Sequence, residues 1–238
     1  LVLCMALTLC SAAFAEGKSP VDGMTVAFIP KVSGNSFFEA ANDGAQKYAA
    51  DWGLTVDYIG APTADVTTQL ELIQQAIDKG VDAICISSVD ATGLDEKLQE
   101  AQDAGIFVST WDSDVSPDAR ALMISQGTAD ALGPMLVDMA VDSLTERGVD
   151  VNGEVKYVWH FSNPSVSDQN SWYVAGDAYI KEKYPTWVAV NDPYYSNQDP
   201  AQSVSVGESI LDAYPDIDLI ICNDSTALPG QLQAAENK

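Results

Sequence analysis

Short apolar runs alternate along most of the chain with longer segments in which apolar residues recur every three or four positions. The runs predict β-strands, and the periodic segments predict amphipathic helices. Because strands and helices alternate, the pattern predicts an α/β fold in which each parallel sheet is doubly wound, with helices on both faces. The predicted strands are 24–30, 54–59, 81–87, 106–111, 122–125, 154–161, 187–193 and 218–223, and examples of the predicted helices are 37–52, 66–79, 129–146 and 203–214.

One break in this alternation predicts a change of domain. After the strand at 106–111 comes a turn, and the short strand at 122–125 follows it with no helix between them. A chain that leaves one sheet and enters another has this pattern. We therefore expect a first lobe at 24–111, a crossing or hinge at 112–121 and a second lobe at 122–238.

The N-terminal segment has the composition of a secretory signal. Residues 1–15 carry no charge and end in Ala13-Phe14-Ala15, the small-x-small pattern that signal peptidase recognises. This apolar run is too short to span a bilayer, so we expect export to the periplasm, or another extracytoplasmic site, with no membrane insertion after processing. Cys10 offers the alternative of a lipid anchor, which Leu9 disfavours because a lipobox requires a small residue there.

Charge excludes two classes of partner. The 238 residues carry a formal net charge of -24, with only two arginines. Such a surface repels nucleic acid and anionic membranes, so we expect neither as a partner. Most of the carboxylates are explained by a solvated acidic coat, and only those at special positions indicate function.

Polar side chains gather where predicted strands end. In parallel sheets a ligand binds beyond the carboxyl ends of the strands. Carboxylates accept hydrogen bonds from hydroxyl groups, lysine and amide groups donate them, and aromatic rings pack on C–H faces, so this set predicts a site for a small neutral polyol. The candidates are Lys31, Asp112, Asp114, Asp168, Gln169, Asn223, Asp224 and Ser225, with Phe37, Phe38, Trp111 and Trp172 as nearby aromatics.

Each candidate also has a purely structural interpretation. Asp112 and Asp114 are residues that often cap turns, Asp168 stands where a helix N-cap is expected, Lys31 is a solvated lysine in the simplest view, and tryptophans belong more often to the core. Motifs for catalysis are missing from the sequence: His160 is the only histidine, and no G-x-S-x-G elbow, dinucleotide fingerprint or P-loop occurs. We therefore expect no enzyme activity, no metal and no cofactor.

Several segments together resemble one family. "VAFIPKVSGNSFFEAANDGAQ", "TWDSDVSPDAR", "ISQGTADALGPMLVDMA", "PSVSDQNSW" and "NDSTALP…AAEN" are similar to successive segments of the periplasmic autoinducer-2 receptors of Lsr-type ABC transporters, within the type 1 sugar-binding periplasmic proteins. The resemblance implies a two-lobed, monomeric receptor that closes on the boron-free cyclic form of autoinducer-2, a furanose-like tetrol, and delivers it to an ABC permease. By the same comparison we expect the chain to be truncated at its C-terminus.

The family pattern places its ligand contacts on four positions of this chain: Lys31, Asp112, Asp168 and Gln169. The last two family contacts are a proline and an alanine that flank an aspartate, whereas Asn223 and Ser225 flank Asp224 here. This departure leaves rhamnose, pentose or hexose binding as an alternative. Two other classes remain: the effector domain of a sugar-responsive repressor, which the signal segment disfavours, and a secreted sugar-modifying enzyme that uses Asp112 and Asp114 as an acid/base pair.

Overall fold

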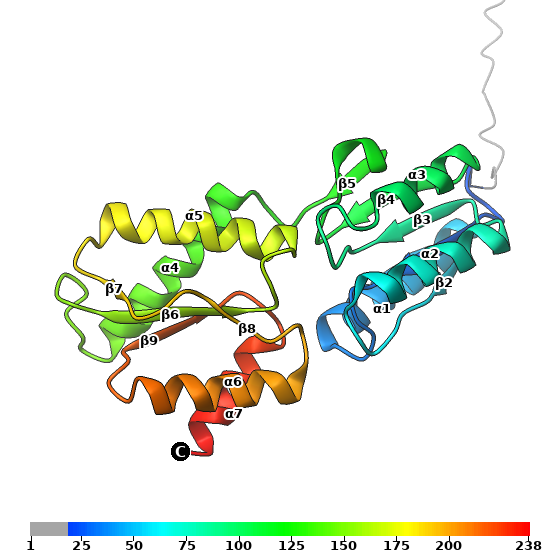
Figure 1. Ribbon diagram of the computed structural model, residues 1–238. Helices are drawn as coiled ribbons and strands as arrows, with labels where there is room; N and C mark the ends of the chain where they lie inside the picture. The colour runs from blue at the N-terminus through cyan, green and yellow to red at the C-terminus, as the bar shows by residue number, and fades with distance from the viewer. Residues whose placement is uncertain (1–18) are drawn as a thin grey trace, which may run out of the picture.

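The structure is a computed structural model that describes residues 19–238, and it contains two separate parallel sheets, each flanked by its own helices (Figure 1). This arrangement confirms the predicted doubly wound α/β fold. The predicted signal segment (1–15) and Cys10 lie outside the described residues. Within residues 19–238, no helix has both the length and the apolar character needed to cross a membrane.

The first sheet has five parallel strands in the order β2-β1-β3-β4-β5. Apolar side chains of α2 and α3 pack on one face of this sheet, and those of α1 pack on the other. Burial on both faces explains why the strands are continuous apolar runs without a period of two. The elements are β1 (Thr25–Ile29), α1 (Ser36–Trp52), β2 (Thr55–Tyr58), α2 (Val66–Lys79), β3 (Ala83–Ile86), α3 (Asp95–Asp103), β4 (Phe107–Trp111), the 3-10 helix η1 (Pro117–Ala119) and β5 (Leu122–Ile124).

The second sheet is built around β6, with which β7, β8 and β9 all pair in parallel. The helices α4 and α5 cover one face and the helices α6 and α7 cover the other (Figure 1). The aromatic side chains of β6 form the centre of this core together with α4 and α5. The elements are α4 (Ala129–Glu146), β6 (Lys156–Phe161), α5 (Ser167–Lys183), β7 (Val188–Ala189), β8 (Tyr194–Tyr195), α6 (Pro200–Ala213), β9 (Leu219–Cys222) and α7 (Ala227–Glu236).

The predicted assignment of the strand at 122–125 to the second sheet is wrong. The strand β5 pairs in parallel with β4, Ser109 opposite Leu122 and Trp111 opposite Ile124, so it is the edge of the first sheet. The segment 112–121 connects two neighbouring strands of one sheet, and the N–H of Asp112 donates to the carbonyl of Ile124 at 3.0 Å. The chain therefore passes from the first sheet to the second between β5 and α4, at residues 125–128.

The predicted strand at 187–193 is shorter in the structure, where it is β7 (Val188–Ala189), and a second short strand, β8 (Tyr194–Tyr195), follows beyond its predicted end. Pro193 has no N–H to donate, so the ladder with β6 is interrupted there. The strand β7 pairs with Lys156 and Tyr157, whereas β8 pairs with His160 and Phe161 at the other end of β6. The carboxyl end of β8 therefore lies beside the carboxyl end of β6. The strand β8 ends at Tyr195, two positions after residue 193, where the prediction ended its strand.

Candidate functional site

The carboxyl ends of the two sheets face each other, and their loops touch. Lys31, which follows β1, donates to Asp168 at the start of α5 over 3.2 Å. Asn35, the N-cap of α1, donates through Nδ2 to Ser225 Oγ, just after β9, over 3.1 Å. Loops at this edge of a parallel sheet are where ligands bind, because helix N-termini and strand ends converge there.

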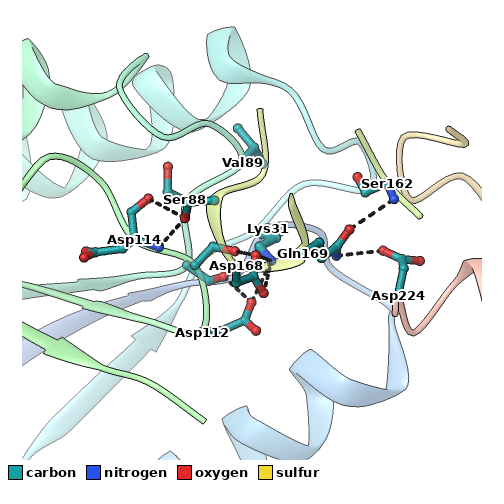
Figure 2. Close-up of polar contacts among 12 residues, drawn as sticks. Lys31, Ser88, Val89, Asp112, Asp114, Ser162, Asp168, Gln169 and Asp224 are labelled. Atoms are coloured by element: carbon teal, nitrogen blue, oxygen red, sulfur yellow. Dashed lines mark hydrogen bonds and ion pairs between the residues drawn. The ribbon is translucent and has the colours of Figure 1, made fainter. Parts of the chain in front are cut away.

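One lysine lies between two carboxylates at the centre of this junction (Figure 2). The Nζ atom of Lys31 lies 2.9 Å from Asp112 Oδ2 and 3.2 Å from Asp168 Oδ1. The lysine is only 2% exposed, Asp112 is buried as well, and the side chain of Asp168 is 8% exposed. A buried ammonium group of this kind needs such partners, because an unpaired buried charge is strongly unfavourable.

Asp112 is held in an unusual backbone conformation. Its φ is 61°, in the left-handed region that side chains other than glycine rarely adopt. Its carboxylate accepts a hydrogen bond from Ser87 Oγ at 2.7 Å and another from the side-chain amide of Gln126. These two contacts, from the residue that follows β3 and from the connection between the sheets, fix the carboxylate beside Lys31.

The three charges in this cluster do not balance. Burial lowers the pKa of Lys31, but the charges of Asp168 and Asp112 outweigh burial and the net effect raises it. Burial raises the pKa of Asp168, Lys31 lowers it, and Asp112 raises it again, so that its pKa lies above the ordinary carboxyl value. One ammonium group can neutralise only one carboxylate, so the cluster carries excess negative charge when both aspartates are ionised, and this excess is the reason that Asp112 raises the pKa of Asp168.

A second cluster is centred on Asp224, in the turn between β9 and α7. Its Oδ1 atom accepts from the backbone N–H groups of Thr226 and Ala227, both at 2.7 Å, so it stabilises the first turn of the helix. Its Oδ2 atom accepts from the side-chain amides of Gln169 at 2.9 Å and Gln198 at 3.3 Å. Figure 2 shows Gln169 held between Asp224 and the backbone of Ser162, and the carboxylate therefore orients two amides.

Asn223 and Ser225, on either side of Asp224, differ in how they are bonded. Asn223 donates from Nδ2 to the backbone carbonyl of Gln169 at 2.8 Å, while its buried Oδ1 has no hydrogen-bond partner among the described residues. The Ser225 hydroxyl contacts Asn35 across the junction. Both positions, where this chain departs from the family pattern, therefore face the junction between the sheets.

A cavity of about 390 Å³ opens between the two clusters. Its volume lies in the range that suits a small-molecule ligand. Most of the predicted site residues line this cavity. They are Lys31, Phe37, Phe38, Asp112, Asp168, Gln169, Asn223, Asp224 and Ser225, and Trp172 lines it as well.

The structure places two of the predicted residues away from the cavity wall. Trp111 is buried, and its ring stacks on Phe28 with 4.8 Å between centroids and meets Phe38 edge-on at 5.7 Å, so it supports the aromatic wall from behind. Asp114 forms a bidentate ion pair with Arg120, at 3.0 Å and 2.7 Å. Burial raises the pKa of Asp114, but Arg120, the Thr110 hydroxyl and the N–H of Val115 together outweigh burial, so the pKa of this carboxyl lies below its ordinary value.

Other lining residues were not predicted from the sequence. Gln126 lies in the connection between the sheets, which the sequence had placed at 112–121. Gln198 follows β8, a strand that the prediction did not include. Had β8 been recognised, the rule that polar residues follow strand ends would have selected Gln198. The remaining wall is apolar and comes from α4 and α7, with Leu132, Met135, Leu136 and Leu228.

The chemistry of the lining suits recognition of a neutral hydroxylated molecule. Carboxylate and amide oxygens accept hydrogen bonds from hydroxyl groups, the ammonium and amide groups donate, and the apolar wall covers C–H groups. Within residues 19–238, no group of three or more His, Cys, Asp or Glu side chains has a geometry that could hold a metal ion. His160 is fully buried on β6 and does not line the cavity.

Solved structures with this fold include several sugar-binding proteins. LsrB from Clostridium saccharobutylicum, solved in complex with AI-2, is 59% identical over 90% of this chain and 66% of its own, with a TM-score of 0.89. This similarity confirms the resemblance inferred from the sequence motifs. A solute-binding protein of an ABC transporter from Burkholderia graminis, in complex with D-arabinose, is 27% identical over 90% of this chain and 70% of its own, with a TM-score of 0.77.

Curated relatives match only part of the chain. The D-ribose/D-allose-binding protein of Pseudomonas aeruginosa is 30% identical over 95 residues, which are 39% of this chain and 30% of the relative. The chain thus matches about a third of that relative and spans about two thirds of LsrB. The family model described as a periplasmic binding protein domain matches residues 26–238, and the chain belongs to this family.

Proposed function

We propose that the protein is an exported receptor that binds autoinducer-2 in the cavity between its two sheets and delivers it to the permease of an ABC importer. The observation that carries the proposal is the cluster of Lys31, Asp112 and Asp168, in which residues that follow the first sheet meet a residue that follows the second. A ligand bound there contacts both halves only when the loops meet. The AI-2 complex of the 59% identical LsrB supports this choice of ligand.

The residues proposed to bind the ligand are those that line the cavity at both sheet edges. Lys31 and Asp112 act from the first lobe, which we now place at 25–124, and Asp168, Gln169, Asn223 and Ser225 act from the second lobe, at 129–236. The connection at 125–128 is the proposed hinge. Hydrogen bonds to charged groups are worth about 1.5–3 kcal/mol each. Three or four of them suffice for micromolar affinity, which corresponds to about 8 kcal/mol.

Closure of the lobes explains how such a receptor signals occupancy. Ligand binding favours the closed form because only that form offers contacts from both lobes at once. The chemistry requires no bond to be made or broken, and the ligand leaves unchanged. We further propose that the receptor acts as a monomer outside the cytoplasm, in keeping with the location for which its family is named.

A thermal-shift panel tests the ligand assignment. The purified protein is heated with autoinducer-2, L-rhamnose, D-ribose or D-arabinose, each at increasing concentration. A ligand present at a hundredfold its Kd should add about 2.7 kcal/mol to the free energy of unfolding. We expect autoinducer-2 to stabilise at the lowest concentration. Stabilisation by rhamnose or a pentose, and none by autoinducer-2, would favour the alternative of a sugar-binding receptor with the same fold.

A further inference from the structure

Gln198 lies in a strained turn between β8 and α6. Asn197 and Gln198 have φ values of 50° and 56°, so two successive residues other than glycine adopt the left-handed conformation. Such residues cost free energy and persist where surrounding contacts fix them, often at functional sites. The turn is fixed at both ends, because the N–H of Asn197 donates to the carbonyl of Ser162 at 2.9 Å and Asp199 caps α6 through the N–H of Gln202.

The side-chain amide of Gln198 has a buried carbonyl oxygen that accepts no hydrogen bond from the described residues. The residue is only 5% exposed and lines the cavity. Its Nε2 atom donates to Asp224 Oδ2 at 3.3 Å, which fixes the orientation of the amide. Its Oε1 atom is buried and has no hydrogen-bond partner among the described residues. A buried acceptor without a partner is unfavourable, so native structures rarely keep one without a reason.

Gln169 shows by contrast what is special about Gln198. Both amides donate to the same oxygen of Asp224, but Oε1 of Gln169 already accepts from the N–H of Ser162 at 3.0 Å. The carbonyl oxygen of Gln169 is therefore occupied, whereas that of Gln198 remains available. In this part of the cavity, only Asn223 offers a comparable buried amide oxygen without a partner among the described residues.

We propose that Gln198 is a further specificity-determining residue, whose Oε1 accepts a hydrogen bond from a hydroxyl group of the bound polyol. This inference rests on the proposed function, because it assigns a contact within the same cavity. A hydroxyl donor would satisfy the orphaned oxygen, whereas a ligand with no donor at that position would leave it buried and unpaired. The strained turn is then the means by which the chain places this acceptor against the ligand.

Isothermal titration calorimetry with autoinducer-2 tests the proposal. Gln198→Met keeps the length of the side chain and removes the acceptor, and we expect its Kd to rise about tenfold, which corresponds to about 1.4 kcal/mol. Gln99→Met is the matched control, because Gln99 is exposed on α3 and does not line the cavity, and it should bind like the wild type. A Kd for Gln198→Met within twofold of the wild-type value would overturn the inference.

A second variant separates loss of a ligand contact from disruption of the turn. Gln198→Asn keeps the amide and tolerates a positive φ, since asparagine adopts the left-handed region more readily. Its shorter side chain withdraws the oxygen from the cavity, so we expect an unchanged melting temperature without ligand and a similarly raised Kd. If Gln198→Asn is folded and binds as tightly as the wild type, Oε1 of Gln198 is not a ligand contact.

The two proposals fail in different ways in this experiment. If the wild type binds none of the sugars tested, the proposed function fails and the inference falls with it. If the wild type binds another sugar in place of autoinducer-2, the ligand assignment fails, and the effect of Gln198→Met on that sugar decides the inference. If the wild type binds and both variants bind equally well, only the inference fails.

Discussion

At the scale of single residues, the site depends on one buried cation shared by two carboxylates. Lys31 lies within 3.2 Å of an oxygen of both Asp112 and Asp168, and these aspartates belong to loops of different sheets. Pairing of this kind contributes little net stability, but removal of one partner leaves uncompensated charge in a buried place. We therefore propose that the lysine both donates a hydrogen bond to a ligand and allows the two loops to approach, because it pairs with an aspartate from each of them.

Replacement of this lysine should selectively weaken binding. In Lys31→Met, closure would bury two carboxylates without a cation, and loss of one partner of a buried pair costs about 3–5 kcal/mol. We expect at least a hundredfold rise in the Kd for autoinducer-2 by titration calorimetry, with little change in the unliganded melting temperature because the open cleft rehydrates both carboxylates.

Lys47→Met is the matched control for this change, since Lys47 is exposed on α1 and does not line the cavity. Its Kd should equal that of the wild type. Unchanged affinity in Lys31→Met would show that the lysine plays no part in ligand binding, and a collapse of its unliganded fold would assign it a structural role instead.

His160 predicts how stability depends on pH. Burial lowers its pKa from 6.5 to about 4, although the charge of Asp224 acts in the opposite direction. The unfolded chain thus takes up a proton near pH 6.5 that the folded chain takes up only near pH 4, so stability falls as pH falls through this window. The shift corresponds to a loss on the order of 3 kcal/mol.

Urea denaturation of the wild type and of His160→Gln between pH 7 and pH 4 measures this effect. The difference in unfolding free energy between the two proteins should change across the window, because only the wild type carries the imidazole. A constant difference from pH 7 to pH 4 would mean that His160 has an ordinary pKa in the folded state.

At the scale of elements, the second sheet depends on a close helix contact. A Cβ atom on Gly133 of α4 would lie 2.6 Å from the backbone nitrogen of Gly176 and 2.7 Å from the carbonyl oxygen of Trp172, both on α5. Backbone atoms cannot move aside as a flexible side chain can. The absence of a side chain at Gly133 therefore sets the distance between α4 and α5, and with it the position of the first turn of α5 at the cavity.

Gly133→Ala should destabilise the fold by about 1–3 kcal/mol, the usual cost of overpacking. Gly44→Ala is the control, because a Cβ atom at Gly44 in α1 would meet nothing within 4 Å. Alanine in an open helical position should stabilise by about 0.5–1 kcal/mol. Urea denaturation measures both changes, and equal effects of the two substitutions would contradict the proposed role of the α4–α5 contact.

The sequence predicted most elements because burial leaves a clear pattern in it. The strands β1, β3 and β4 are apolar runs that helices cover on both faces, and Lys31 and Asp168 could be placed because they follow strand ends. The pairing of β5 with β4 could not be predicted, since it depends on a backbone turn at Asp112 whose φ of 61° has no glycine to mark it. That turn also separates Asp112, which faces the cavity, from Asp114, which pairs with Arg120.

Gln198 was missed for a related reason. The predicted strand ended at Pro193, and the two-residue strand β8 begins only after it, so the polar residues that follow β8 did not appear to follow a strand. Strand pairing depends on contacts between distant segments, and the local pattern of apolar residues carries no record of these contacts. The sequence therefore predicted the sheet edge at which the site lies, but it did not predict every residue of the site.

At the scale of the whole molecule, the contacts between the lobes indicate a closed form. Besides the contact of Lys31 with Asp168, Asn35 bonds Ser225 and the N–H of Asp114 donates to Ser167 Oγ at 3.0 Å. These bonds join loops that belong to different sheets. We expect the unliganded protein to open at residues 125–128, where a single connection passes between the two sheets within the described part of the chain.

Small-angle X-ray scattering should detect this motion. Because the ligand contacts both lobes only in the closed form, saturating autoinducer-2 should lower the radius of gyration of the wild type. Lys31→Met at the same ligand concentration should keep the larger radius. An identical radius with and without ligand, under conditions where binding is measured, would contradict closure as the response to ligand.

The central claim is that polar side chains from both lobes bind one uncharged hydroxylated ligand in the cavity between them. Titration calorimetry of the purified protein with autoinducer-2 tests it most directly. The account predicts saturable heat with one ligand bound per protein molecule and recovery of the ligand chemically unchanged. No heat of binding with autoinducer-2, rhamnose or any pentose, or conversion of the ligand during the titration, would contradict it.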